Sequence, residues 1–113
     1  MIAEKDSWRL SHIIEAIENI EEFAAGVDKE KFMNDYPLQC VFFRQFEVIG
    51  EAAGNLSASL TEGHLEIDWQ KIKGMRNRII HGYFEVDLDI LWDTMQNDLS
   101  KLKKQIENIL KEL

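Results

Sequence analysis

The scarcity of chain-breaking residues constrains this chain more than any other feature of its sequence. Its 113 residues include one proline, Pro37, and six glycines. Sandwiches and barrels of short strands need many turns, and Gly and Pro supply most of them. Long helices need few such breaks. We therefore expect an all-α protein.

Apolar residues recur three and four positions apart along most of the chain, which is the spacing of amphipathic helices. The pattern predicts four main helices, at about 7–25, 37–60, 69–82 and 89–113. Because there are no internal repeats, low-complexity segments or long linkers, we expect one domain over residues 1–113. The expected architecture is an antiparallel bundle of four to five helices.

Several residues mark where these helices should begin and end. Gly26 is suited to end the first helix, and Asp28 to cap a short turn over residues 29–34. Pro37 fits the first turn of the second helix, and Asp68 is a candidate cap for the third. The predicted boundaries therefore depend on capping residues as well as on periodicity.

The second predicted helix is apolar on more than one face. Small residues, including Gly50, Ala53 and Gly54, lie in its middle. A helix of this kind is either central in its bundle or also buried against a second subunit. Both arrangements remain open here, and we favour a homodimer.

The overall composition is typical of a folded, cytoplasmic protein. There are 13 Lys and Arg against 21 Asp and Glu, a net charge of −8, with 45% hydrophobic residues. The N-terminus has no apolar signal core, and no apolar stretch approaches the roughly 20 residues that span a bilayer. We therefore expect neither export nor a membrane partner.

The cysteine and the tryptophans are expected to have structural roles. Cys40 is the single cysteine, so an intramolecular disulfide is excluded, and its apolar neighbours favour a position in the core. Trp8, Trp69 and Trp92 are spread over three predicted helices. We expect them to anchor the bundle rather than to form a base-stacking surface.

Positive charge is concentrated in one segment. Residues 69–82 contain four basic residues and no acidic one, whereas the rest of the chain has nine basic and 21 acidic residues. Each lysine taken singly is explained by surface ion pairs. As a group they can bind phosphate, and a two-fold axis would double the local field.

Within this segment Arg76 is followed by His81 and then by Tyr83. On a helix Arg76 and Tyr83 share one face, and Asn77 and His81 lie on the neighbouring stripe. An imidazole transfers protons near neutral pH, and a guanidinium holds a phosphate and offsets charge in the transition state. These residue types are those that RNA cleavage without a metal ion requires.

The chain resembles the HEPN superfamily and, within it, the HepT-like toxins. The resemblance covers essentially the whole chain, including Ile-Gly-Glu-Ala-Ala at 49–53. Its most specific element is the Arg-x-x-x-x-His-x-Tyr pattern, which Arg76, His81 and Tyr83 match. One departure is Asp68, which stands where the family usually has proline, and we expect it to alter only the start of the helix.

The resemblance implies a HEPN-type bundle that acts as a homodimeric endoribonuclease without a metal or other cofactor. It implies that Arg76 and His81 are the catalytic pair. It also implies a toxin whose partner is an MntA-like nucleotidyltransferase antitoxin. That antitoxin would silence the nuclease by transferring AMP to Tyr83.

Other residues of the segment have supporting roles in this hypothesis. Lys73, Arg78 and Asn77 are candidates for RNA contact, although Asn77 could instead bond to a neighbouring helix. Glu51 could face the cleft and orient Arg76. The simpler alternative is that Glu51 is one of two solvated carboxylates four positions apart on a helix.

Two other classes of function use the same residues. One is a non-catalytic helical module that presents nucleotide or RNA to a separate nucleotidyltransferase. The other is a purely structural dimerisation domain. The first does not need His81 for chemistry, and the second predicts no salt-dependent affinity for RNA.

Overall fold

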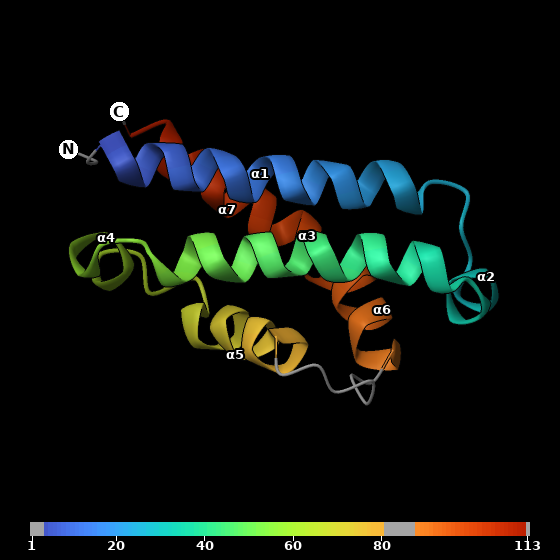
Figure 1. Cartoon of the computed structure of the whole chain (residues 1–113). Coiled ribbons are helices and arrows are strands. Elements are labelled where there is room, and N and C mark those ends of the chain that lie inside the picture. The colour runs from blue at the N-terminus through green and yellow to red at the C-terminus, as the bar shows by residue number, and fades with distance from the viewer. Residues whose placement is uncertain (1–3, 81–87, 113) are drawn as a thin grey trace.

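The structure, a computed structural model, describes residues 4–80 and 88–112, and within them every regular element is a helix (Figure 1). The expected all-α fold is thereby confirmed. In these described ranges, no helix is long and apolar enough to cross a membrane. The helices are α1 (Glu4–Ala24), α2 (Lys29–Asn34), α3 (Tyr36–Gly54), α4 (Ala58–Glu62), α5 (Trp69–Ile80), α6 (Leu88–Asn97) and α7 (Leu99–Leu110).

The first predicted boundaries are confirmed. Gly26 follows the end of α1 with φ at +74°, in the left-handed region that favours glycine. Asp28 caps α2, because its Oδ1 accepts a hydrogen bond from the backbone N–H of Lys31 at 2.8 Å. Pro37 lies in the first turn of α3. Local chemistry therefore sets the connection from α1 to α3.

Helix α3 lies between α1 and α5 and packs against both (Figure 1). It is antiparallel to α1, because Asn19 Nδ2 donates to Gln45 Oε1 at 3.3 Å toward one end and Asp6 bonds to Ser57 beyond the other. Helix α7 packs against α1. The central position of α3 explains why it is apolar on more than one face, and burial against a second subunit stays a prediction.

Two of the predicted helices are broken, so their expected boundaries were wrong. The second predicted helix ends at Gly54 rather than Leu60, because Ser57 caps the separate helix α4. The last predicted helix consists of α6 and α7, which meet at Asp98. The apolar periodicity continues through both breaks and does not locate them. Residues 4–80 and 88–112 therefore hold seven helical segments.

The core is formed by side chains from all seven described helices. Trp69 of α5 is also buried and Trp92 packs against the core, as expected for anchoring residues. The bundle is thus closed around one continuous apolar cluster. The largest fully buried side chains are Leu10, Ile13, Ile17, Ile20, Phe32, Phe42, Leu91, Ile106 and Ile109.

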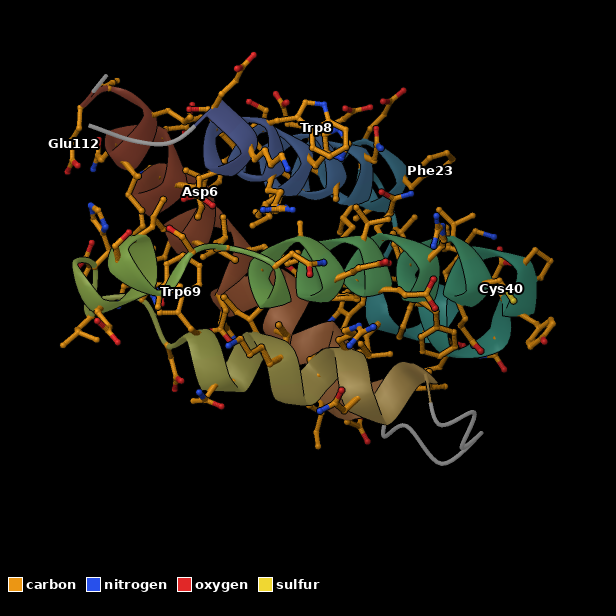
Figure 2. All side chains as sticks on the ribbon, turned by 60° about the vertical axis from the view of Figure 1, so that its left-hand side comes forward. Asp6, Trp8, Phe23, Cys40, Trp69 and Glu112 are labelled. Atoms are coloured by element: carbon orange, nitrogen blue, oxygen red, sulfur yellow. The ribbon has the colours of Figure 1, made fainter. Side chains whose placement is uncertain are left out.

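Two residues that were expected in the core lie at the surface. Cys40 is exposed, because Phe42 points inward and two positions along a helix turn a side chain by about 200°. Trp8 is 61% exposed for the same reason, since Leu10 is fully buried. Figure 2 shows Trp8 pointing away from the bundle. The expected roles of Cys40 and Trp8 were therefore wrong.

Candidate active site

Helix α5 carries the residues that the sequence singled out, and its start is held in two ways. Asp68 Oδ1 accepts a hydrogen bond from the backbone N–H of Lys71 at 3.0 Å, so the expected cap is confirmed. Trp69 is 6% exposed, and its Nε1 donates to the carbonyl oxygen of His64 at 3.1 Å (Figure 2). These contacts fix where α5 begins against the rest of the bundle.

Arg76 lies on the side of α5 that packs against α3. Residues four and seven apart share a helix face, and Ile72 and Trp69, which precede Arg76 by these steps, both contact the core. Opposite Arg76 lies Gly50 of α3. A Cβ placed on Gly50 would be 2.9 Å from the Cγ and 3.3 Å from the Cα of Arg76, and closer still to its Cβ. The two helices therefore meet where α3 has no side chain.

The guanidinium of Arg76 has no partner in the part of the chain that the structure describes. Its Nε is buried and makes no hydrogen bond. No described carboxylate forms an ion pair with it. A buried donor left unpaired costs roughly 1–3 kcal/mol, so native proteins usually satisfy such a group with a protein atom, a water or a ligand. Arg76 can therefore bind an anion that the described residues do not supply.

The other basic residues of the segment differ in their surroundings. Lys71 Nζ donates to Asp98 Oδ2 at 3.1 Å, so the surface ion pair that explains a single lysine is present here. Lys73 is half-buried and forms no ion pair with a described residue, and Asn77 is exposed. Arg78 belongs to α5, but its side chain is outside the described part. Among the described basic side chains of the segment, Arg76 and Lys73 are therefore the two that form no ion pair with a described residue.

The remaining predicted site residues are brought together only in part. His81 and Tyr83 lie outside the described residues, so their expected place beside Arg76 stays a prediction. Glu51 is exposed on α3, and in the described chain no hydrogen bond or ion pair joins its carboxylate to Arg76. The stretch 49–53 and the start of the arginine motif do meet, at the contact of Gly50 with Arg76.

A hollow of about 220 Å³ lies on the neighbouring side of α5. Ile49 of α3, Met75 of α5 and Leu102 of α7 contribute to its apolar floor, and Lys71 and Asp98 to its charged rim. Arg76 does not line it. The hollow is therefore separate from the surface that the arginine presents.

From the sequence, Gly50 had no expected role beyond its small size. Glycine weakens a helix interior relative to alanine, so a glycine inside α3 already indicates that something approaches closely. The partner could not be identified from spacing, because Gly50 and Arg76 belong to different helices. Their contact appears only when α3 and α5 are packed.

The chain is similar to ribonucleases over most of its length. A family model described as "Ribonuclease HepT-like" matches residues 13–109. "Putative RNase TTE0752" of Caldanaerobacter subterraneus subsp. tengcongensis is 39% identical over 101 residues, which cover 89% of this chain and 90% of that protein. "Probable ribonuclease HepT" of Thermococcus cleftensis is 40% identical over 102 residues, which cover 90% of this chain and 93% of that protein. No solved structure matches the chain significantly.

Proposed function

The chain belongs to the HepT-like ribonuclease family, and from that premise we propose that it is a metal-independent endoribonuclease with Arg76 and His81 as catalytic residues. The names of its relatives support the class of reaction. The observation that carries the assignment of Arg76 is its buried, unpartnered Nε on the packing face of α5. A guanidinium that no described carboxylate pairs with is ready to bind a phosphate.

The proposed reaction is attack of an RNA 2′-hydroxyl on the adjacent phosphorus. The bond from O2′ to phosphorus forms and the bond from phosphorus to O5′ breaks, which leaves a 2′,3′-cyclic phosphate and a 5′-hydroxyl. His81 takes the proton of the attacking hydroxyl, and an imidazolium returns a proton to the leaving oxygen. Arg76 offsets the negative charge that grows on the phosphate oxygens.

A homodimer fits this chemistry, because the reaction needs two proton transfers and each chain has one His81. Two copies of the site that face each other would supply one imidazole for each transfer. The doubled positive field would also attract RNA to a chain of net charge −8. Light scattering of the purified protein measures whether the dimer exists.

We further propose that the nuclease is a toxin whose partner is an MntA-like nucleotidyltransferase antitoxin, with Tyr83 as the AMP acceptor. The sequence supports this, since Tyr83 follows His81 by two positions and belongs to the same short motif as Arg76. A phosphate on Tyr83 would occupy the guanidinium and repel incoming RNA. The modification would thus silence the site without unfolding it.

Incubation of the purified protein with RNA and a chelator tests the reaction. Wild type is expected to leave 2′,3′-cyclic phosphate ends, and His81→Ala to bind RNA without cleaving it. Salt-dependent binding by both proteins with cleavage by neither would instead identify the non-catalytic module that presents RNA to a nucleotidyltransferase. Equal cleavage by both would remove His81 from the mechanism.

A further inference from the structure

We propose that Gly50 is a positioning residue for Arg76. Because Gly50 has no side chain, α5 approaches α3 closely enough to hold the Arg76 stem in one place at the interface of the two helices. This inference rests on the proposed function of Arg76 in binding the phosphate of RNA. It assigns part of the site to a residue that touches neither RNA nor the reacting atoms.

The contact is specific to this glycine among those in the described helices. A Cβ on Gly50 would be 2.9 Å from Cγ and 3.3 Å from Cα of Arg76. A Cβ on Gly54, at the end of the same helix, or on Gly74, two positions before Arg76, would meet nothing within 4 Å. Only at Gly50 does a glycine of α3 or α5 make room for the facing helix.

The crowding cannot be relieved by a rotamer change of the arginine. The nearest atoms of Arg76 include its Cα and Cβ, which move only with the backbone of α5. An alanine at position 50 would therefore force α5 to shift or rotate against α3. Because Arg76 is on the packing face, that movement would displace its guanidinium together with the helix.

A fixed stem has a direct use in phosphate binding. An arginine loses conformational freedom when it clamps a phosphate, and a stem already held by packing loses less. The Nε of Arg76 is buried as well, so packed atoms cover the side chain beyond Cγ. Gly50 thus prepares Arg76 for its ligand, and a shifted stem would weaken binding even with the arginine present.

The test is a double-mutant cycle on RNA affinity, measured with a labelled single-stranded RNA in the His81→Ala background so that no cleavage interferes. Arg76→Ala is expected to weaken binding on the order of tenfold and to lower the salt slope by about one. Gly50→Ala is expected to weaken binding severalfold when Arg76 is present. It should have no further effect on affinity in the Arg76→Gly background, which lacks both the guanidinium and the Cβ and Cγ that the new methyl group meets.

Gly54→Ala is the matched control, since it places the same methyl group on α3 against open space. Its RNA affinity should equal that of the parent protein. A loss of affinity from Gly50→Ala that is the same with and without Arg76, or no loss at all, would overturn the role of Gly50. If Arg76→Ala leaves affinity unchanged, the phosphate-binding role of Arg76 fails as well, and the two failures are thereby distinguished.

If Gly50→Ala prevents folding, a second variant that exchanges the sizes of the two facing residues still tests the contact. Combining Gly50→Ala with Arg76→Gly removes the Cβ and Cγ that the new methyl group meets. The double variant should regain the helical circular dichroism of wild type while binding RNA no better than Arg76→Gly alone. If the exchange does not restore folding, the crowding is not with the Arg76 side chain and the inference is wrong.

Discussion

Asp6 of α1 and Ser57, which caps α4, are joined by two hydrogen bonds across 51 positions of sequence. The backbone N–H of Ser57 donates to Asp6 Oδ1 at 3.0 Å, and the Ser57 hydroxyl donates to Oδ2 at 2.5 Å. Asp6 is 3% exposed, so its carboxylate depends on these donors. The pair fastens the start of α1 to the link between α3 and α4.

Asp6→Ala should therefore lower the free energy of unfolding. The substitution leaves the N–H of Ser57 without its acceptor, and the Ser57 hydroxyl keeps only the Ser59 hydroxyl at 3.3 Å, so the cost is roughly 1–3 kcal/mol. Ser59→Ala is the control, because Ser59 is exposed and close to the same cap. Urea denaturation measures both variants, and equal stabilities for Asp6→Ala and wild type would show that the buried pair does not stabilise the fold.

Alanine at two glycines should have opposite effects on stability. Gly74 lies inside α5 with open space around its Cα, so Gly74→Ala should raise the free energy of unfolding by about 0.5–1 kcal/mol. Gly26 has φ at +74°, which strains any residue with a side chain, so Gly26→Ala should lower the free energy of unfolding by roughly 1 kcal/mol or more. Thermal melting of both variants gives the comparison, and shifts of the same sign would contradict it.

His64 makes stability depend on pH. Its Nδ1 lies 2.9 Å from the carbonyl oxygen of Leu60 and its Nε2 lies 3.1 Å from a carboxylate oxygen of Glu112. The pKa of His64 is raised above its ordinary 6.5, and the largest cause is the hydrogen bond to the Leu60 carbonyl. Partial burial lowers the pKa, whereas the bond to Glu112 and the charges of Glu112 and Glu66 raise it. Folding therefore favours the protonated imidazole.

The stabilisation from His64 should be complete below pH 6.5 and should be lost as pH rises through the raised pKa. Glu112→Gln removes one cause of the raised pKa, so its stability should fall less than that of wild type between about pH 6 and about pH 8.5. Glu107→Gln, on α7 five positions before Glu112, is the control. Urea unfolding at the two pH values measures the free energy of unfolding. An equal fall in this free energy for Glu112→Gln and wild type would contradict the account.

The two tyrosines of the chain separate modification from other causes of silencing. Tyr83→Phe denies a nucleotidyltransferase its hydroxyl, so this variant should stay toxic and gain no adenylyl mass when the antitoxin is coexpressed. Tyr36→Phe is the control, because Tyr36 is the other tyrosine and is 62% exposed. Survival of cells that make Tyr83→Phe with the antitoxin would argue against Tyr83 as the acceptor.

Periodicity and capping residues predicted much of the bundle. Asp28, Asp68 and Pro37 act at the positions that local chemistry indicated, because a cap needs only the next turn of its own chain. The break before α4 was missed because Ser57 draws part of its hydrogen bonding from Asp6, which is distant in sequence. Such a bond cannot be inferred from neighbouring residues.

In the candidate site, too, features set by neighbouring residues could be predicted, and contacts between helices could not. The charge of residues 69–82 and the spacing of Arg76, His81 and Tyr83 could be recognised in the sequence. That Arg76 lies against Gly50, with its Nε unpartnered, depends on how α3 and α5 pack. Sequence spacing fixes which residues share a helix, and packing decides which of them are buried.

The rate of RNA cleavage by Arg76→Ala tests the central claim most directly. Arg44→Ala is the matched control, because Arg44 is an exposed arginine of α3 that is paired with Glu47. At saturating RNA and with chelator present, Arg76→Ala should cleave about 10²–10³-fold more slowly than wild type, as expected when a group that stabilises transition-state charge is lost. Arg44→Ala should cleave at the wild-type rate. Cleavage by Arg76→Ala at the wild-type rate would contradict the account.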